Sequence, residues 1–314
     1  MLGVRTVALG SLLFALALPF GCADEPSESV PTTALPDLEV ANSDLRILDL
    51  STGVTRAVAV TDRSEEWPTW SPDGRRLAFH RWTSGGRVEG ETDLWTVDVE
   101  TSQERVALSR AGVEVTASWS PDGERLVFMA KTSDGDADVW SLDLASGVVS
   151  QLTSGRAGDF LPALSPDGSQ LAVLRWSDHQ GVAIQDVGSL AEPRIITPSD
   201  VEVSAFAWSP TGDAIAYVAT RENELPRLWI VSLDEADMPR EVSGPTAPAW
   251  LTWSPDGGSL AFSEAADGHL YRIDVRTGVV TQLTDGTTDD LEPSWSPDGR
   301  LIAYAAYPNP PRIG

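Results

Sequence analysis

The stretch that decides the fold is Trp295-Ser296-Pro297-Asp298-Gly299-Arg300-Leu301-Ile302-Ala303-Tyr304, because close variants of it occur five times earlier in the chain. The earlier copies begin at Trp70, Trp119, Leu164, Trp208 and Trp253. Their prolines stand at positions 72, 121, 166, 210 and 255, which with Pro297 gives steps of 49, 45, 44, 45 and 42 residues. A repeat of this length is typical of solenoids, propellers and other arrays of supersecondary units.

Each copy predicts a β-hairpin. Proline presets φ for a type I turn, the Ser and Asp side chains can bond to nearby amides, and Gly supplies the left-handed residue that follows. The segments after the turns are short apolar runs, as expected of strands buried on both faces. These runs are 77–79, 126–128, 171–173, 215–217, 260–262 and 302–304.

Between the hairpins lie pairs of alternating apolar and polar segments, each pair joined by a tight polar turn. The first is 93–98 with 104–108, and the others are 138–143 with 148–153, 182–187 with 194–197, 227–233 with 240–243, and 269–275 with 279–284. Such alternation indicates half-exposed outer strands. Each repeat is therefore expected to hold four strands.

The order of segments at the two ends predicts how the array closes. The domain opens with an outer pair, 45–49 and 55–60, and ends with a hairpin, 294–305. Together these halves complete a sixth unit, and a closed ring removes the exposed sheet edges that an open array would leave. We predict an all-β fold: a six-bladed β-propeller over residues 43–314, closed by an N-terminal strand pair that joins the C-terminal hairpin.

The first 42 residues carry export features. Arg5 precedes an apolar run from Val7 to Phe20 that has the length of a signal-peptide core and is too short to span a bilayer. We expect a signal peptide at 1–21 and an acidic, Pro- and Ser-rich linker at 22–42 that is disordered. Cys22 after Gly21 resembles the lipobox of bacterial lipoproteins, although Pro19 departs from it. We expect Cys22 to be acylated on a periplasmic or outer-membrane-anchored lipoprotein; the alternative is ordinary cleavage that leaves a free thiol.

The repeat Pro-x-Trp-Ser-Pro-Asp-Gly-x-x-Leu-Ala-Phe resembles the WD-like propeller repeats of the TolB family over residues 44–307. The resemblance implies a propeller. It says less about activity, because such repeats serve periplasmic interaction proteins, propeller domains of prolyl-oligopeptidase-like peptidases and some lyases.

Composition limits the partners. The chain has 47 acidic and 22 basic residues, a net charge of −25, and such a surface repels nucleic acid and anionic lipid. The acidity serves solubility first, although it also attracts basic proteins or cations. With a single cysteine no intrachain disulfide forms. We expect no nucleic-acid partner, membrane contact only through the lipid anchor, and a monomer.

Sequence motifs for catalysis are missing from the 314 residues: there is no Gly-x-Ser-x-Gly elbow, no His-Glu-x-x-His and no phosphate-binding loop. The three histidines, His80, His179 and His269, are expected in alternate blades at the outer radius, too far apart to share a metal. They are therefore interpreted as isolated surface histidines.

The tryptophans divide into two groups. Five recur at the first position of the motif and are predicted to pack between neighbouring blades. Trp67, Trp82 and Trp250 break that pattern and are the candidates for surface anchors.

Acidic residues recur five positions before the motif tryptophan or Leu164 in four of the repeats, and we expect them around the mouth of the central channel. The candidate ligand-binding residues are Glu65, Glu114, Asp159 and Asp290, with Glu202 displaced by one position and Pro248 breaking the series. Such a ring suits Ca²⁺ or a peptide that bears Lys or Arg. The alternative is that each acid caps its own loop or is solvated separately. Asp134, Asp136 and Asp138 faintly resemble a calcium loop but lack its downstream Glu, so they predict a hairpin turn.

These features favour a non-catalytic envelope scaffold that binds a protein or peptide at the acidic channel face. No cofactor is expected, with Ca²⁺ as the one candidate. The alternative is a metal- or calcium-dependent hydrolase or lyase on a propeller scaffold.

Overall fold

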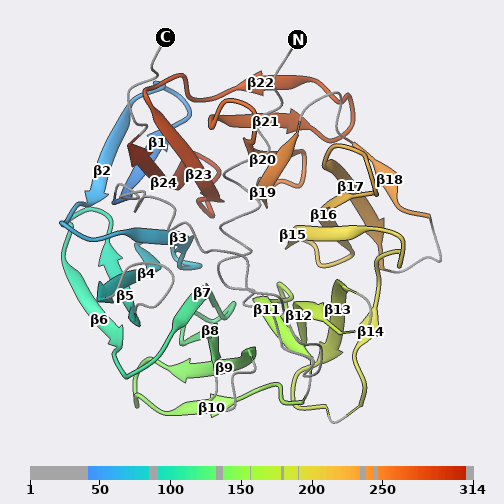
Figure 1. Cartoon of the computed structure of the whole chain (residues 1–314). Coiled ribbons are helices and arrows are strands. Elements are labelled where there is room, and N and C mark those ends of the chain that lie inside the picture. The colour runs from blue at the N-terminus through green and yellow to red at the C-terminus, as the bar shows by residue number, and fades with distance from the viewer. Residues whose placement is uncertain are drawn as a thin grey trace, which may run out of the picture.

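The protein is an all-β ring of six four-stranded antiparallel sheets (Figure 1), which confirms the predicted six-bladed propeller. The computed structural model describes residues 42–84, 91–131, 137–155, 157–177, 180–189, 191–233, 238–242 and 247–308. Neighbouring innermost strands pack in the order β3, β7, β11, β15, β19 and β23, and β23 packs on β3 to complete the ring.

Each blade runs from an innermost strand beside the propeller axis to an outermost strand at the rim. The innermost strands are β3 (Glu65–Trp70), β7 (Glu114–Trp119), β11 (Gly158–Leu164), β15 (Glu202–Trp208), β19 (Pro248–Trp253) and β23 (Thr288–Trp295). The second strands are β4 (Arg76–Ser84), β8 (Arg125–Lys131), β12 (Gln170–Trp176), β16 (Ala214–Thr220), β20 (Ser259–Glu264) and β24 (Leu301–Pro308). The third strands are β5 (Glu91–Asp98), β9 (Ala137–Asp143), β13 (Gln180–Asp186), β17 (Arg227–Ser232), β21 (Leu270–Asp274) and β1 (Asp44–Asp49). The outermost strands are β6 (Glu104–Leu108), β10 (Val149–Gln151), β14 (Arg194–Ile195), β18 (Arg240–Glu241), β22 (Val280–Gln282) and β2 (Thr55–Ala59).

We number the blades by their innermost strands, so that blades 1 to 5 start with β3, β7, β11, β15 and β19, and blade 6 is β23, β24, β1 and β2. The propeller has two faces. The turn face carries the Ser-Pro-Asp-Gly hairpins and the turns between third and outermost strands. The loop face carries the connections from second to third strands and from one blade to the next.

Blade 6 is assembled from both ends of the described chain. Its strand order is β2-β1-β24-β23, and β1 pairs with β24 along its whole length, with Leu45 opposite Ala305 and Ile47 opposite Ala303. Leu45, Ile47 and Leu48 are at most 2% exposed. The N-terminal strand pair therefore contributes core residues to a sheet whose other half lies some 250 positions later in sequence.

The Ser-Pro-Asp-Gly turn closes through its own side chains. In blade 1 the Ser71 hydroxyl donates to Asp73 Oδ1 over 2.6 Å and accepts from the Arg76 amide over 2.9 Å. The Ser71 hydroxyl, more than the Arg75 amide, holds the pKa of Asp73 below its ordinary value. In blade 4, where Thr211 replaces the aspartate, Asp213 takes over and accepts from both Ser209 and Thr211.

The six turns also touch one another around the turn face. A Cβ built on the glycine of each turn would lie 3.3–3.8 Å from the proline ring of the preceding blade. The six contacts are Gly74 on Pro297, Gly123 on Pro72, Gly168 on Pro121, Gly212 on Pro166, Gly257 on Pro210 and Gly299 on Pro255. The motif glycine thus serves the left-handed turn and the packing of one blade on the next.

A pair of glycine substitutions separates these two roles. Gly212 has φ +77° and a Cβ there would lie 3.3 Å from Pro166 Cδ, whereas Gly53 has φ +71° and open space around it. We expect Gly53→Ala to cost about 1–2 kcal/mol of unfolding free energy from φ alone. Gly212→Ala is expected to cost at least about 1 kcal/mol more, because the added methyl overpacks the blade contact. Urea unfolding of both variants checks this, and equal losses would show that the contact contributes nothing.

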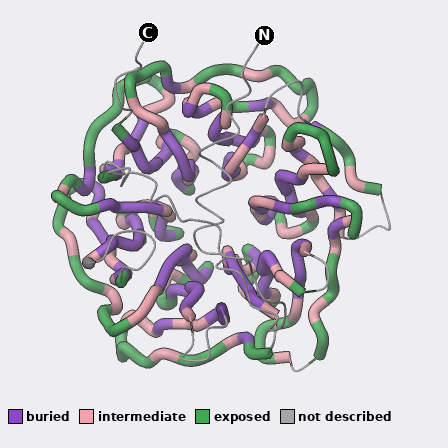
Figure 2. Tube along the Cα trace, in the orientation of Figure 1, coloured by how far each residue is buried: buried purple, intermediate pink, exposed green. Residues whose placement is uncertain are grey.

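Motif tryptophans join the blades as predicted. Four indole Nε1 atoms donate to backbone carbonyls of the preceding blade: Trp70 to Ser294 at 3.1 Å, Trp119 to Thr69 at 3.1 Å, Trp208 to Ala163 at 3.1 Å and Trp253 to Ala207 at 3.2 Å. Trp295 differs, since it donates to Gly299 of its own turn. Buried residues concentrate inside the blades and exposed ones along the outer rim (Figure 2).

Candidate functional site

The five predicted ligand-binding carboxylates lie at or near the loop-face ends of the innermost strands, but four of them are buried. Glu65 is 0% exposed, Glu114 2%, Asp159 1% and Asp290 1%, whereas Glu202 is exposed. The structure therefore does not gather them as an open ring. Each of the four has partners within its own blade or in the connection that leads into it.

In blade 1 the partner of Glu65 is Arg81, which stands directly opposite it on β4. Arg81 Nε lies 2.7 Å from Glu65 Oε1, and Arg81 Nη2 lies 2.8 Å from Glu104 Oε2. The guanidinium also stacks 4.4 Å from the ring centroid of Trp95. Burial nevertheless raises the pKa of Glu65, because it outweighs the Thr61 hydrogen bond and the Arg81 charge.

Blades 2 and 3 repeat this arrangement with different donors. Arg175 binds Asp159 through two parallel bonds, Nε to Oδ1 at 2.7 Å and Nη2 to Oδ2 at 2.8 Å. The Asp159 hydrogen bonds raise the pKa of Arg175. In blade 2 the donor is Arg110 from the β6–β7 connection, whose Nε lies 2.6 Å from Glu114 Oε1. Burial raises the pKa of Glu114 despite this partner.

Blades 5 and 6 hold a buried carboxylate at this place with hydroxyl or amide donors in place of arginine. Asp290 accepts from the Thr288 hydroxyl at 2.7 Å, and burial raises its pKa. Blade 5, where Pro248 interrupts the acidic series, places Glu264 opposite Pro248 on β20. Glu264 is 5% exposed and accepts from the Ala247 amide at 2.9 Å, so the carboxylate is supplied by the second strand. Glu264 is not among the residues predicted from the sequence, although it occupies the repeat position that holds Arg81 in blade 1.

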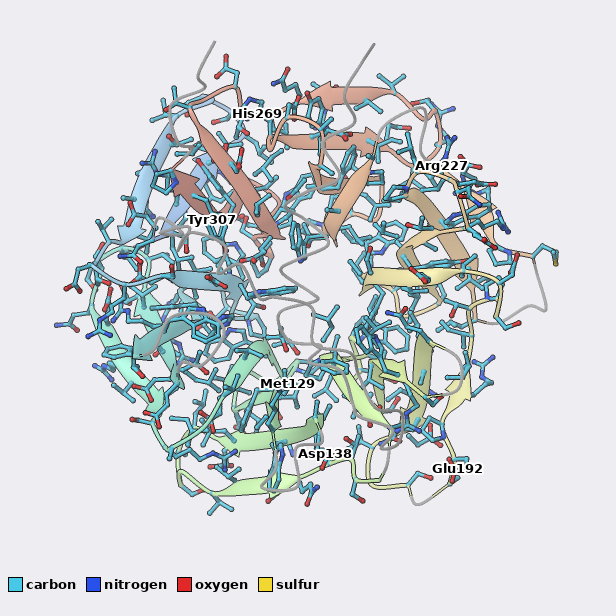
Figure 3. All side chains as sticks on the ribbon, in the orientation of Figure 1. Met129, Asp138, Glu192, Arg227, His269 and Tyr307 are labelled. Atoms are coloured by element: carbon cyan, nitrogen blue, oxygen red, sulfur yellow. The ribbon has the colours of Figure 1, made fainter. Side chains whose placement is uncertain are left out.

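Neither of the two histidines that the structure describes is fully exposed. His80 is 1% exposed, and its Nε2 lies 3.5 Å from Glu66 Oε2, so the expectation of a surface position is wrong for His80. His269 is half-buried and lies at the junction of blades 5 and 6 (Figure 3). His179 lies outside the described residues, as do Cys22, Asp134 and Asp136. Asp138 is 3% exposed and accepts from Gln151 across its hairpin at 2.9 Å.

Among the residues that the structure describes, no group of three or more His, Cys, Asp or Glu side chains is arranged to hold a metal ion. Nor does any helix in the described ranges have the length and apolar character needed to cross a bilayer.

Every innermost strand contains a bulge that the sequence analysis missed. All six pairings between innermost and second strands shift register once. Four of the bulges hold a non-glycine residue with positive φ: Trp67 at 57°, Thr116 at 53°, Leu161 at 51° and Glu292 at 58°. Each stands three positions before the motif tryptophan or Leu164, and in three of the four the next residue is proline. Proline inside a strand is confined to edges and bulges, so Pro68, Pro162 and Pro293 were the available signal.

Three residues at this bulge position come together from blades 5, 6 and 1. The rings of Trp67 and Trp250 meet edge to face, with centroids 6.2 Å apart and an interplanar angle of 83°. Glu292 Oε2 accepts from the Trp67 amide at 2.7 Å, and Glu292 Oε1 accepts from the Tyr307 hydroxyl at 3.3 Å. Trp250 is 5% exposed and Trp82 8%, so the expectation that these two are surface anchors is wrong. Trp67 alone of the three candidates is partly exposed.

Curated proteins similar to this chain match it over only part of their own length. The chain is 28% identical over 184 residues to the Tol-Pal system protein TolB of Francisella tularensis subsp. tularensis, covering 55% of this chain and 41% of that protein. It is 26% identical over 258 residues to the uncharacterized peptidase YuxL of Bacillus subtilis, covering 81% of this chain and 30% of that protein. The chain thus spans well under half the length of these curated relatives.

Solved structures share the fold. A TolB-like protein of Agrobacterium tumefaciens superposes with a TM-score of 0.72 at 22% identity, covering 86% of this chain and 99% of that one. An oligogalacturonate lyase in complex with manganese superposes with a TM-score of 0.57 at 14% identity, covering 86% and 98%. The TolB β-propeller domain family matches residues 27–250 and 190–308, which together include all six repeats. The chain belongs to the TolB β-propeller domain family.

Proposed function

We propose that this domain is a non-catalytic scaffold that binds a protein or peptide partner at its loop face in the cell envelope. Family membership supports a binding role, because the TolB relative is named as part of the Tol-Pal system. The envelope location rests on the apolar segment before Cys22, and acylation of Cys22 and a monomeric state are part of the same proposal.

The observation that carries the proposal is the charge of the loop face. Buried carboxylates that pair with arginines lie at the loop-face ends of blades 1 to 3, and exposed carboxylates lie in the connections of the same face. The exposed acids of this face include Asp62, Glu91, Asp200, Glu202, Glu222, Glu224 and Asp285. Two of them have arginine partners on the same face, since Arg63 lies 3.8 Å from Asp62 and Arg221 lies 3.1 Å from Asp200. Such a surface favours a basic partner through charge complementarity, which raises the association rate and excludes acidic competitors.

The five predicted binding residues enter this proposal in different ways. Glu202 is exposed and available for direct contact. The other four are buried beneath the loop face, where they hold local structure in place: Glu65, Glu114, Asp159 and Asp290. Direct contact of a ligand or of Ca²⁺ with these four remains a prediction.

The alternative is a metal- or calcium-dependent hydrolase or lyase. It is supported by a relative named as a peptidase and by the fold shared with a lyase bound to manganese. The described residues provide no grouped metal ligands for that chemistry.

Affinity capture from envelope extract, with and without chelator, tests the proposal. A loop-face variant, Asp200→Asn with Glu202→Gln, is compared with a turn-face variant, Glu100→Gln with Glu124→Gln, that changes the net charge equally. All four residues are exposed. We expect the loop-face variant to reduce recovery of the captured protein several-fold and the turn-face variant to leave it unchanged. Equal recovery by both variants would contradict a loop-face site, and loss of capture with chelator would show that a divalent cation takes part in binding.

A further inference from the structure

We propose that Trp67, Trp250 and Glu292 form a binding site for one cationic side chain, the ammonium of a lysine or the guanidinium of an arginine, presented by a peptide. This inference rests on the proposed function and deepens it, because it names the chemistry that a partner would insert next to the propeller axis.

The three residues converge although they belong to three blades. β19 and β3 are separated in the ring by β23, yet the Trp67 and Trp250 rings are in edge-to-face contact. Glu292 on β23 joins them through its 2.7 Å bond with the Trp67 amide. Tyr307 on β24 of blade 6, labelled in Figure 3, donates its hydroxyl to the other carboxylate oxygen.

This cluster occupies one side of the ring of bulge positions. Because the innermost strands are related by rotation about the propeller axis, residues three positions before the motif tryptophan or Leu164 form a ring around it. In blades 5, 6 and 1 these residues are Trp250, Glu292 and Trp67, and in blades 2, 3 and 4 they are Thr116, Leu161 and Ala205. The aromatic rings and the carboxylate at this position therefore all lie in blades 5, 6 and 1. A ligand next to the axis would contact this half of the ring and not the other.

The bulges determine where these side chains lie. Trp67 and Glu292 hold positive φ at 57° and 58°, as Thr116 and Leu161 do at the same position of blades 2 and 3. Non-glycine residues keep this conformation only where the surrounding structure holds it, so the three side chains are fixed next to the propeller axis.

The side chains of this cluster favour a cationic ligand. The face of a tryptophan attracts ammonium and guanidinium groups, and a carboxylate beside it adds a charge-assisted hydrogen bond. The Trp67 amide and the Tyr307 hydroxyl hold the Glu292 carboxylate in place through one hydrogen bond to each oxygen. Trp67 keeps part of its surface exposed, while Trp250, Glu292 and Tyr307 are 5%, 3% and 7% exposed. A ligand would therefore meet Trp67 first and bring its charge toward Glu292.

The test is a titration of the protein with the tripeptide acetyl-Gly-Lys-Gly-amide, followed by the NMR signals of the indole N–H groups. The buffer contains 0.15 M salt, because a net charge of −25 attracts cations diffusely and salt screens that attraction. The Trp67→Leu variant assigns the Trp67 signal. We expect saturable shifts of the Trp67 and Trp250 signals, and binding at least about tenfold weaker for the norleucine tripeptide, which lacks the charge.

Charge-matched variants complete the test. Glu292→Gln keeps an oxygen acceptor for the Trp67 amide and is expected to weaken lysine tripeptide binding about tenfold. Glu124→Gln makes the same change of net charge at an exposed position on the turn face and is expected to have no effect. If Glu292→Gln does not fold, Trp67→Leu replaces it with the same expected loss. Equal binding of the norleucine tripeptide, shifts spread over all indole signals, or no shift at all would overturn the site.

The outcomes also separate this site from the proposed function. If the titration succeeds and no loop-face partner is captured, the proposed function fails and the cation site stands. If a loop-face partner is captured and the tripeptide does not bind, the cation site alone fails.

Discussion

A protein that starts at residue 62, and therefore lacks β1 and β2, is expected to lose its cooperative thermal unfolding transition. The truncation removes Leu45, Ile47 and Leu48, each at most 2% exposed, and leaves β24 with an unpaired edge. Deleting one buried Leu or Ile side chain costs about 2–5 kcal/mol. Three such losses, with the lost strand pairing, match or exceed the roughly 5–15 kcal/mol that holds a typical domain folded. Calorimetry of the truncated and intact proteins makes the comparison.

A circular permutant of residues 42–314 provides the matched control, because it keeps every residue of the propeller. It starts at Asp62, joins Gly314 directly to Asn42, and ends at Thr61, so that β1 follows β24 as a third strand follows a second strand in every other blade. Asp44 stands opposite Ala306, which makes the new connection a hairpin. We expect the permutant to melt within about 5 °C of the intact protein. A truncated protein that melts at the same temperature as the intact chain would show that blade 6 does not need its N-terminal half.

Turn chemistry made the fold predictable from sequence. Pro297 and its five counterparts specify hairpins whose side-chain bonds are local, so each hairpin is recognisable without knowledge of its neighbours. The order of segments at the two ends was then enough to infer six blades. Even the exception in blade 4 is local, because Asp213 replaces the missing aspartate from two positions away.

The candidate site was less predictable, because its contacts depend on cross-strand register. Sequence places Glu65 at the start of an innermost strand, but only the pairing with β4 shows that Arg81 stands opposite and neutralises it. In the same way, Pro248 interrupts the acidic series in sequence, whereas Glu264 restores a carboxylate from the neighbouring strand.

The bulges explain the largest omission. In a regular strand, side chains alternate between the two faces of the sheet, so Trp67 and Trp70 would lie on opposite faces. The bulge in β3 inserts one residue between them and changes the face to which the preceding side chains point. The meeting of Trp67 with Trp250, 183 positions away in sequence, depends on the conformation of two bulges. Pro68 marks one of them, and nothing in the sequence alone links the two.

Arg175→Met is expected to destabilise the protein by about 3–5 kcal/mol, because it leaves the Asp159 carboxylate buried without its charged partner. Asp159 is 1% exposed and bound through two oxygens at 2.7 and 2.8 Å, so water cannot replace the guanidinium without opening blade 3. For a domain of this size the loss corresponds to a fall in melting temperature of roughly 6–20 °C. The control is Arg63→Met at the exposed pair with Asp62, where the closest atoms are 3.8 Å apart and the expected change is within about 1 kcal/mol.

The double variant Asp159→Leu with Arg175→Met decides between a structural and a ligand-binding role for this carboxylate. Replacing both partners by apolar groups removes the unpaired charge, so stability is expected to recover most of what Arg175→Met loses. If Asp159 only supports the blade, the stable double variant will still capture the same partner as the unmodified protein. If Asp159 contacts the ligand, the double variant will remain stable but lose capture. Capture by a stable double variant therefore separates the two roles, because the loss of stability has been removed and only direct contact with the ligand remains to change the result.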